Sequence, residues 1–147
     1  MDNNIMKIDG TQYIMVDIGD EQYGIDIKYI DNIVRMQKIT RVPKAQKYFV
    51  GVINLRGEIV PVMSLRRRFG LEEDVITDKT RIIILKPEQE SIGIIVDSVR
   101  EVVTLSEEDK EKIYSDGKDD RAKYISEVGK LPHGLVSLLN VNGVIAE

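Results

Sequence analysis

Few residues of this 147-residue chain have the chemistry that catalysis or metal binding requires. The chain has no cysteine, which excludes a disulfide framework, a thiolate zinc site and a cysteine nucleophile. Its one histidine, His133, cannot form a two-histidine metal site within one chain and is interpreted as a turn or rim residue. Asp97 and Glu101 could act as an acid pair, but no phosphate-cradling glycine loop, serine elbow or zinc motif accompanies them. The sequence therefore predicts a protein that is not an enzyme and holds neither a metal nor a cofactor.

Two charged runs could bind ions. Arg66-Arg67-Arg68 could form a patch for phosphate or acidic lipid, but three arginines on a short exposed helix are more typical of a solvated face. The run from Asp116 to Asp120 suggests calcium, yet it lacks the alternating oxygen ligands and closing glutamate of a calcium loop, so we interpret 115–121 as a polar loop. The net charge of -4 and the pI of about 5.2 argue against non-specific nucleic-acid binding.

The chain carries no sign of a targeting or membrane segment. Residues 1–7 lack a basic region followed by an apolar stretch, and no apolar run approaches the roughly 20 residues of a membrane span. We therefore expect a soluble intracellular protein with no direct membrane insertion and no nucleic-acid partner.

The apolar residues indicate strands. The chain has 21 Ile and 16 Val but 9 Leu and 3 Ala, and β-branched residues favour strands. Short apolar runs separated by turn residues predict hairpins over 13–27, 50–63 and 81–96, and a further strand over 134–141. Pro61, which has no amide hydrogen, predicts an edge or an irregularity in its strand. Three shorter signals are a helix over 65–69 capped by Ser64, a capping box at 106–109 and a turn at Asn142-Gly143.

The chain contains an internal duplication. Segments 24–34 and 93–103 share the pattern glycine, Ile, any, aliphatic, any, any, aliphatic, any, any, aliphatic, Val, at an offset of 69 residues. Further on, 52–65 matches 128–141 at an offset of 76, so the second copy has seven extra residues. The repeats span approximately 13–71 and 82–141. Each copy is too small for a stable core of its own, so the sequence predicts two small barrels that share a core.

The duplication also helps to separate fold from function. We interpret positions that match in both copies as structural, whereas a distinctive residue in only one copy is a functional candidate. In the tight turn between 50–55 and 58–63, Arg56 aligns with Pro132 and Gly57 with His133. The turn therefore does not require an arginine, and Arg56 becomes a candidate for binding.

A long part of the chain resembles the CheW family of chemotaxis adaptor proteins. The resemblance rests on Pro43 and on the segments YFVGVINLRGEIVPV at 48–62, RRRFGL at 66–71 and GIIVDSV at 93–99. It implies a single CheW-like domain over 1–147. The implied fold is mainly β, with two small five-stranded Src-homology-like barrels that share a core and with short helices. The chain has no room for a receiver or kinase domain, so it is similar to the free-standing adaptor.

The resemblance also implies a function and its residues. The implied protein is a non-enzymatic scaffold that couples membrane chemoreceptors to the CheA histidine kinase, in the cytoplasm at chemoreceptor arrays. Aliphatic side chains would receive the cytoplasmic tip of the receptor's helical hairpin, with an arginine offering donors at the rim. The receptor-binding residues carried over by position are Ile30, Ile33, Arg56 and Val99. The candidates for binding the regulatory domain of CheA are Thr80, Arg81 and Ile83.

Some alternatives stay open. Family members commonly have glutamate at position 32 and often aspartate at position 64, whereas this chain has Asn32 and Ser64, and Asn32 removes a charge on which a receptor contact could depend. Ile30, Ile33 and Val99 could also be ordinary core residues. The alternative function is a peptide-binding double-barrel module unrelated to chemotaxis. Such modules use an aromatic groove, and this chain has no tryptophan and two phenylalanines.

Overall fold

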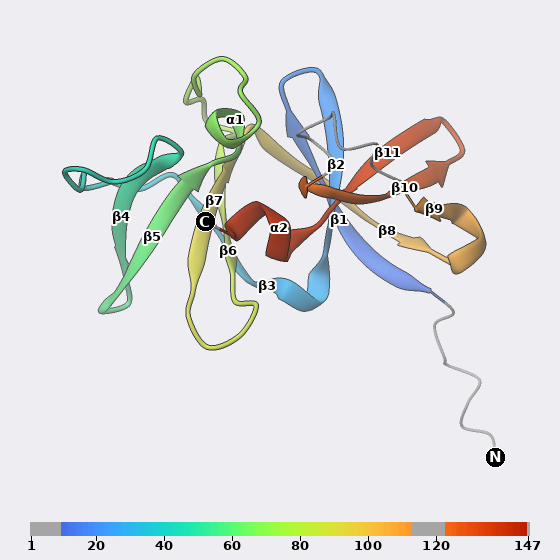
Figure 1. Cartoon of the computed structure of the whole chain (residues 1–147), viewed down its shortest axis with the longest axis horizontal. Helices are drawn as coiled ribbons and strands as arrows, with labels where there is room; N and C mark the ends of the chain where they lie inside the picture. Colours follow the sequence, from blue (N-terminus) through green and yellow to red (C-terminus); the bar gives the residue numbers. More distant parts are fainter. Residues whose placement is uncertain (1–9, 113–122, 147) are drawn as a thin grey trace.

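The computed structural model of the chain describes residues 10–112 and 123–146 and consists mainly of strands (Figure 1). The strands in chain order are β1 Thr11–Ile18, β2 Glu21–Asp26, β3 Ile30–Arg35, β4 Phe49–Leu55, β5 Glu58–Ser64, β6 Arg81–Leu85, β7 Ile92–Val96, β8 Ser98–Leu105, β9 Lys110–Lys112, β10 Ile125–Leu131 and β11 Gly134–Leu139. The short helices are η2 Ile27–Tyr29, α1 Leu65–Arg68, η3 Glu107–Asp109 and α2 Val141–Ile145.

The strands form two sheets that lie side by side (Figure 1). The six-stranded sheet has the order β8-β1-β2-β11-β10-β9, and the five-stranded sheet has the order β3-β6-β7-β5-β4. The predicted hairpins are all present, as the antiparallel pairs β1–β2, β4–β5 and β6–β7. The mainly β architecture of two small sheets with short helices is therefore confirmed, and the short β9 adds a sixth strand to one sheet.

Each sheet contains strands from both repeats. β8 of the second copy pairs with β1 of the first, with Val99 opposite Val16, and β3 of the first copy pairs with β6 of the second, with Ile30 opposite Leu85. The offset of 69 residues relates Val16 to Leu85 and Ile30 to Val99, so the two pairings are equivalent. The copies do not fold as one barrel each. They exchange strands reciprocally, which ties the two sheets into one unit.

The first glycine of the repeated pattern lies at equivalent parallel strand pairings in the two sheets. β11 pairs with β2 where Leu138 lies opposite Gly24, and β5 pairs with β7 where Val62 lies opposite Gly93. A Cβ atom on Gly24 would lie 2.8 Å from Cδ2 of Leu138, and one on Gly93 would lie 2.8 Å from Cγ2 of Ile82. A side chain at either position would clash with the core, which explains the glycine at the start of the repeated pattern.

A shared core joins the two sheets. One buried cluster contains Val16 and Ile25 from the six-stranded sheet together with Met63 and Ile83 from the five-stranded sheet, and Val141 of α2 packs in the same cluster. Two smaller clusters each belong to one sheet. Apolar area buried between the sheets stabilises both at once, so we expect them to unfold together.

The two helices that follow β5 and β11 are equivalent down to their caps. Ser64 Oγ accepts a hydrogen bond from the Arg67 amide at 3.2 Å, as predicted, and Asn140 Oδ1 accepts one from the Gly143 amide at 3.2 Å. The predicted turn at Asn142-Gly143 is therefore wrong, because the Asn140 side chain caps a helix there, just as a serine or threonine would. The predicted capping box at 106–109 is confirmed and opens η3.

Pro61 lies within an interior strand, not in an edge strand. Pro61 is opposite Val52 of β4, and the parallel pairing of β5 with β7 begins only at Val62. The first half of β5 thus has a partner strand on one side, which explains how a residue without an amide hydrogen fits there. The polar loop predicted over 115–121 lies outside the described residues.

Candidate functional site

Arg56 occupies a strained position at the tip of the β4–β5 hairpin. Its φ is 54° and that of Gly57 is 83°, so both central residues of this two-residue turn are in the left-handed region. Asn54 Oδ1 accepts a hydrogen bond from the Gly57 amide at 3.0 Å and stabilises the turn. Turns of this kind favour Asn-Gly, and a residue with a long side chain there costs roughly 1 kcal/mol. The exposed guanidinium of Arg56 is therefore not explained by the turn.

The three aliphatic candidates for receptor binding are half-buried. Ile30, Ile33 and Val99 all pack against the shared core and still expose part of their surface. These residues therefore lie at the edge of the core and also present apolar area at the surface. Val99 belongs to the six-stranded sheet and the others to the five-stranded sheet, so a surface that includes all of them spans both sheets. Asn32 Oδ1 accepts a hydrogen bond from the Ile33 amide at 2.8 Å.

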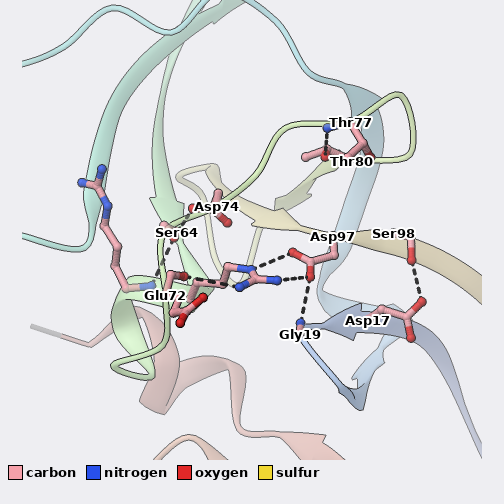
Figure 2. Close-up of polar contacts among 11 residues, drawn as sticks. Asp17, Gly19, Ser64, Glu72, Asp74, Thr77, Thr80, Asp97 and Ser98 are labelled. Atoms are coloured by element: carbon pink, nitrogen blue, oxygen red, sulfur yellow. Dashed lines mark hydrogen bonds and ion pairs between the residues drawn. The ribbon is translucent and has the colours of Figure 1, made fainter.

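Two of the three kinase candidates cannot touch a partner directly in this structure. Ile83 has no exposed surface and Thr80 is 3% exposed. Thr80 Oγ1 accepts a hydrogen bond from the Thr77 amide at 2.9 Å (Figure 2), and Arg81 Nη1 donates to the Thr80 carbonyl at 2.9 Å. Arg81 is the candidate with a side chain at the surface, whereas Thr80 and Ile83 can only position it.

A hollow of about 390 Å³ brings Arg81 and Val99 to the same place. Lys79 and Arg100 also line this hollow, together with Asp17 and Ser98. Asp17 accepts hydrogen bonds from Arg100 Nε at 2.8 Å and from Ser98 Oγ at 2.5 Å. The sequence places Val99 and Arg81 on separate surfaces, and their proximity could not be predicted from it, because the two residues belong to different sheets.

The first arginine of the 66–68 run is held by a bidentate ion pair. Arg66 Nε donates to Asp97 Oδ1 at 3.0 Å and Nη2 donates to Asp97 Oδ2 at 2.6 Å, while the Gly19 amide donates to the same Oδ2 at 2.8 Å (Figure 2). Burial by itself would raise the pKa of Asp97, but these hydrogen bonds outweigh it and hold that pKa below its ordinary value. Asp97 is thus a structural carboxylate rather than one member of an acid pair with Glu101.

The other two arginines of the run are also held. Arg67 Nη2 lies 3.0 Å from Glu73 Oε2, and Arg67 Nη1 donates to the Lys47 carbonyl at 3.0 Å. The Arg68 guanidinium lies 4.0 Å from the centre of the Tyr48 ring and 5.2 Å from that of Tyr124. The interpretation of this run as a solvated face is therefore wrong, because α1 lies where the two sheets meet and each arginine finds a partner there.

A second carboxylate near α1 behaves in the opposite way. Asp74 Oδ2 accepts a hydrogen bond from Ser64 Oγ (Figure 2), and its Oδ1 is buried without a hydrogen-bond partner among the described residues. Burial raises the pKa of Asp74 above its ordinary value, and the hydrogen bond from Ser64 only partly opposes that effect. Asp97 and Asp74, which both lie near Arg66, are thus shifted in opposite directions.

The described part of the chain shows neither a metal-binding cluster nor a membrane-spanning helix. Over 10–112 and 123–146, no group of three or more His, Asp or Glu side chains converges as a metal site would require. No helix in the same ranges is long and apolar enough to cross a membrane.

Comparisons with known proteins give consistent results. Residues 12–147 match the model of the CheW-like domain. A chemotaxis protein CheW of Bacillus subtilis is 35% identical over 136 residues, which cover 92% of this chain and 87% of that protein. A chemotaxis protein CheW of Helicobacter pylori is 32% identical, over 91% of this chain and 81% of that protein. The crystal structure of the scaffolding protein TtCheW from Thermoanaerobacter tengcongensis superposes with a TM-score of 0.85 at 27% identity, covering 94% of each chain.

Proposed function

The chain belongs to the CheW-like domain family, and from this premise we propose that it is a non-enzymatic adaptor of chemotaxis, which couples membrane chemoreceptors to the CheA histidine kinase. The observation that carries the proposal within this chain is Arg56. This exposed arginine sits in a left-handed turn that does not favour it and that has Pro132 at the equivalent position of the other copy. Strain of this kind at an exposed residue is typical of a functional site.

The proposed receptor surface consists of Ile30, Ile33, Val99 and Arg56. The half-buried aliphatic side chains offer apolar area to one face of a receptor helix, and they are already fixed by the shared core, so little side-chain entropy is lost on binding. Arg56 at the hairpin tip offers a planar set of donors to carboxylates or carbonyl groups of the helix. Asn32 leaves this surface without the negative charge that a glutamate would add.

The proposed kinase contact centres on Arg81. Two hydrogen bonds to backbone carbonyls orient its side chain, one to Asp78 at 2.8 Å and one to Thr80 at 2.9 Å. The buried Thr80 and Ile83 contribute by fixing the start of β6. Because Arg81 and Val99 line one hollow, the kinase and the receptor would meet close to each other on this protein. The proposed location is the cytoplasm, at membrane chemoreceptor arrays.

A pull-down with purified partners tests the proposal. The folded protein is expected to bind a receptor cytoplasmic fragment and a CheA regulatory domain. Arg56→Glu is expected to abolish receptor binding, to keep kinase binding and to change the free energy of unfolding by less than about 1 kcal/mol. Arg41→Glu is a matched control, because Arg41 is exposed on a loop and should leave both contacts unchanged.

Three outcomes would contradict the proposal or part of it. A folded protein that binds neither partner would exclude the adaptor function and favour the unrelated peptide-binding module. Unfolding of the Arg56→Glu variant would show that Arg56 is structural. Equal loss of binding in Arg41→Glu would show that overall charge, and not the hairpin tip, determines the interaction.

A further inference from the structure

The internal duplication creates two equivalent junctions between helix, hairpin and sheet, which differ in how they are filled. We call the first the filled junction and define it by Gly19, Tyr23, Arg66, Phe69 and Asp97. We call the second the open junction and define it by the equivalent residues. The offset of 69 relates Gly19 to Glu88, Tyr23 to Ile92 and Asp97 to Lys28. The offset of 76 relates Arg66 to Asn142 and Phe69 to Ile145.

The filled junction is closed by an arginine and an aromatic ring from α1. Phe69 lies between two tyrosines, with ring centres 5.3 Å from Tyr23 and 5.4 Å from Tyr124. Arg66 spans from α1 to Asp97, and Asp97 in turn accepts a hydrogen bond from the β1–β2 turn. The side chains of Arg66 and Asp97 are 17% and 26% exposed, so this pair covers much of the junction.

The open junction has an equivalent helix start but smaller side chains on its helix and on the strand beside it. The Ser64 amide donates to the Tyr48 carbonyl at 2.8 Å, and the equivalent Asn140 amide donates to the Tyr124 carbonyl at 2.8 Å, so the two helices start alike. In the open junction, however, Asn142 replaces the arginine, Ile145 the phenylalanine and Ile92 the tyrosine. A hollow of about 630 Å³ remains there, within the usual range of binding pockets.

The open junction also lacks the ion pair that would close it. Lys28 stands at the position of Asp97, but its side chain is 67% exposed and its Nζ lies 3.8 Å from Asp26 Oδ2. The hollow has an apolar floor that includes Phe49, Pro61 and Ile145, and a rim with Glu88 and Glu90. Among the described residues that line it, these two glutamates are charged and none is basic. Both glutamates are exposed and free to approach a cation.

We propose that the open junction is a docking site for a segment of a partner protein that carries an arginine three residues before an aromatic residue. The guanidinium would pair with Glu88 and Glu90, and the aromatic ring would lie on the apolar floor. Two independent features support this occupant: the charge of the rim, and the fact that the chain fills the equivalent junction with the same pair, Arg66 and Phe69. The site is separate from the proposed receptor surface, because none of that surface's residues lines the hollow.

A peptide with the sequence of the segment that fills the filled junction is the direct probe. A fluorescent peptide with the sequence of residues 64–71, SLRRRFGL, is titrated with the full-length protein and its anisotropy is measured. Saturable binding is expected, and a scrambled peptide of the same composition is expected to bind at least tenfold more weakly. Glu88→Lys with Glu90→Lys is expected to weaken binding at least tenfold. The matched control is Glu101→Lys with Glu108→Lys, two exposed glutamates of the other sheet and η3, which should leave binding within twofold.

A second variant tests the proposal even if Glu88→Lys with Glu90→Lys perturbs folding. Asn142→Arg with Ile145→Phe and Lys28→Asp transplants the filled junction into the open one, and a folded variant is expected to lose peptide binding. Equal binding by this variant, or by the scrambled peptide, would overturn the proposal.

Two other occupants of the hollow would also overturn it. The first is a second copy of the chain, shown by self-association that Glu88→Lys with Glu90→Lys abolishes. The second is the chain's own amino-terminal segment, shown by a tenfold gain in peptide binding when residues 2–9 are deleted.

Discussion

The filled junction and the open junction are formed by equivalent strands, equivalent helix starts and equivalent parallel pairings, yet different side chains occupy them. In the filled junction, Arg66 and Phe69 connect α1 to both sheets. In the open junction, Asn142 and Ile145 leave a hollow of about 630 Å³. Backbone hydrogen bonding therefore preserves the duplication, while side-chain volume and charge have diverged. One junction thus connects its helix to both sheets, while the other leaves a hollow at the surface.

The two equivalent hairpin tips are also of equal length but differ in their side chains. The β4–β5 tip carries Arg56 with a φ of 54°, whereas the β10–β11 tip carries Pro132 and His133 before Gly134, which has a φ of 148°. Both tips turn the chain within two residues, but only one of them places a long cationic side chain at a strained position. The difference again lies in a side chain that the turn does not need.

Truncation of the aromatic ring should give the largest difference between the junctions. Phe69→Ala removes the ring that contacts Tyr23 and Tyr124, and we expect it to lower the free energy of unfolding by about 3 kcal/mol. Ile145→Ala, at the equivalent position, should cost only about 1 kcal/mol, because that side chain borders a hollow and is not enclosed. Urea denaturation of both variants measures the difference. Equal costs would mean that the junctions contribute equally to stability.

Removal of the ion pair should have the next largest effect, and its size should depend on pH. Arg66→Ala leaves Asp97 without its main partner, and we expect a loss of about 2 kcal/mol at pH 7, whereas Asn142→Ala should cost less than about 0.5 kcal/mol. The lowered pKa of Asp97 means that its stabilising contribution is complete above its unfolded pKa of about 3.9 and is lost as pH falls through the folded pKa.

The pH dependence of that variant separates charge from packing. Denaturation at several pH values should show the wild-type protein and Arg66→Ala converging as pH falls from about 4, the unfolded pKa, through the lower folded pKa of Asp97. A gap that stays constant from pH 7 to pH 3 would show that Arg66 acts through packing of its side chain and not through the pair.

Asp74 should respond in the opposite sense and more weakly. Its raised pKa means that the folded state favours the protonated carboxyl, so its contribution is complete below the unfolded pKa and is lost as pH rises through the folded pKa. Asp74→Asn removes the cost of the buried charge, and the amide oxygen can still accept the hydrogen bond from Ser64. We expect a gain of less than about 1 kcal/mol at pH 7 that shrinks as pH falls toward 4. A loss of stability at pH 7 would contradict this account.

The sequence predicted the hairpins and the capped α1, because each depends on local patterns. Period-two apolar runs, turn residues and a serine before a helix are visible within a few positions. It could not predict that each sheet takes strands from both repeats, since the pairing of β3 with β6 and of β8 with β1 is decided by contacts far apart in the chain. β3 and β8, which make these pairings, also lie outside the predicted hairpins.

The candidate site was predictable to a smaller extent. Arg56 stood out because the duplication showed that its turn does not need it. The burial of Thr80 and Ile83, the partners of the three arginines and the hollow of the open junction depend on how α1 and α2 pack between the sheets. The contrast between Phe69 and Ile145 was the available signal for that hollow, because aligned positions of unequal volume in a duplicated fold indicate a cavity on one side.

The smallest effect concerns the hairpin tip and tests whether Arg56 is retained against a cost in stability. Asn tolerates a positive φ better than Arg, so Arg56→Asn should raise the free energy of unfolding by about 0.5 kcal/mol and at the same time weaken receptor binding. Gly57→Ala is the matched control: its φ of 83° disfavours a side chain, and it should lower stability by about 1 kcal/mol without removing the guanidinium. Urea denaturation and the receptor pull-down on both variants separate the two effects. If Arg56→Asn destabilised the protein, the arginine would stabilise its own turn and the contrast with Pro132 would lose its functional meaning. If Arg56→Asn stabilises the protein and also loses receptor binding, Arg56 is retained for binding and not for stability.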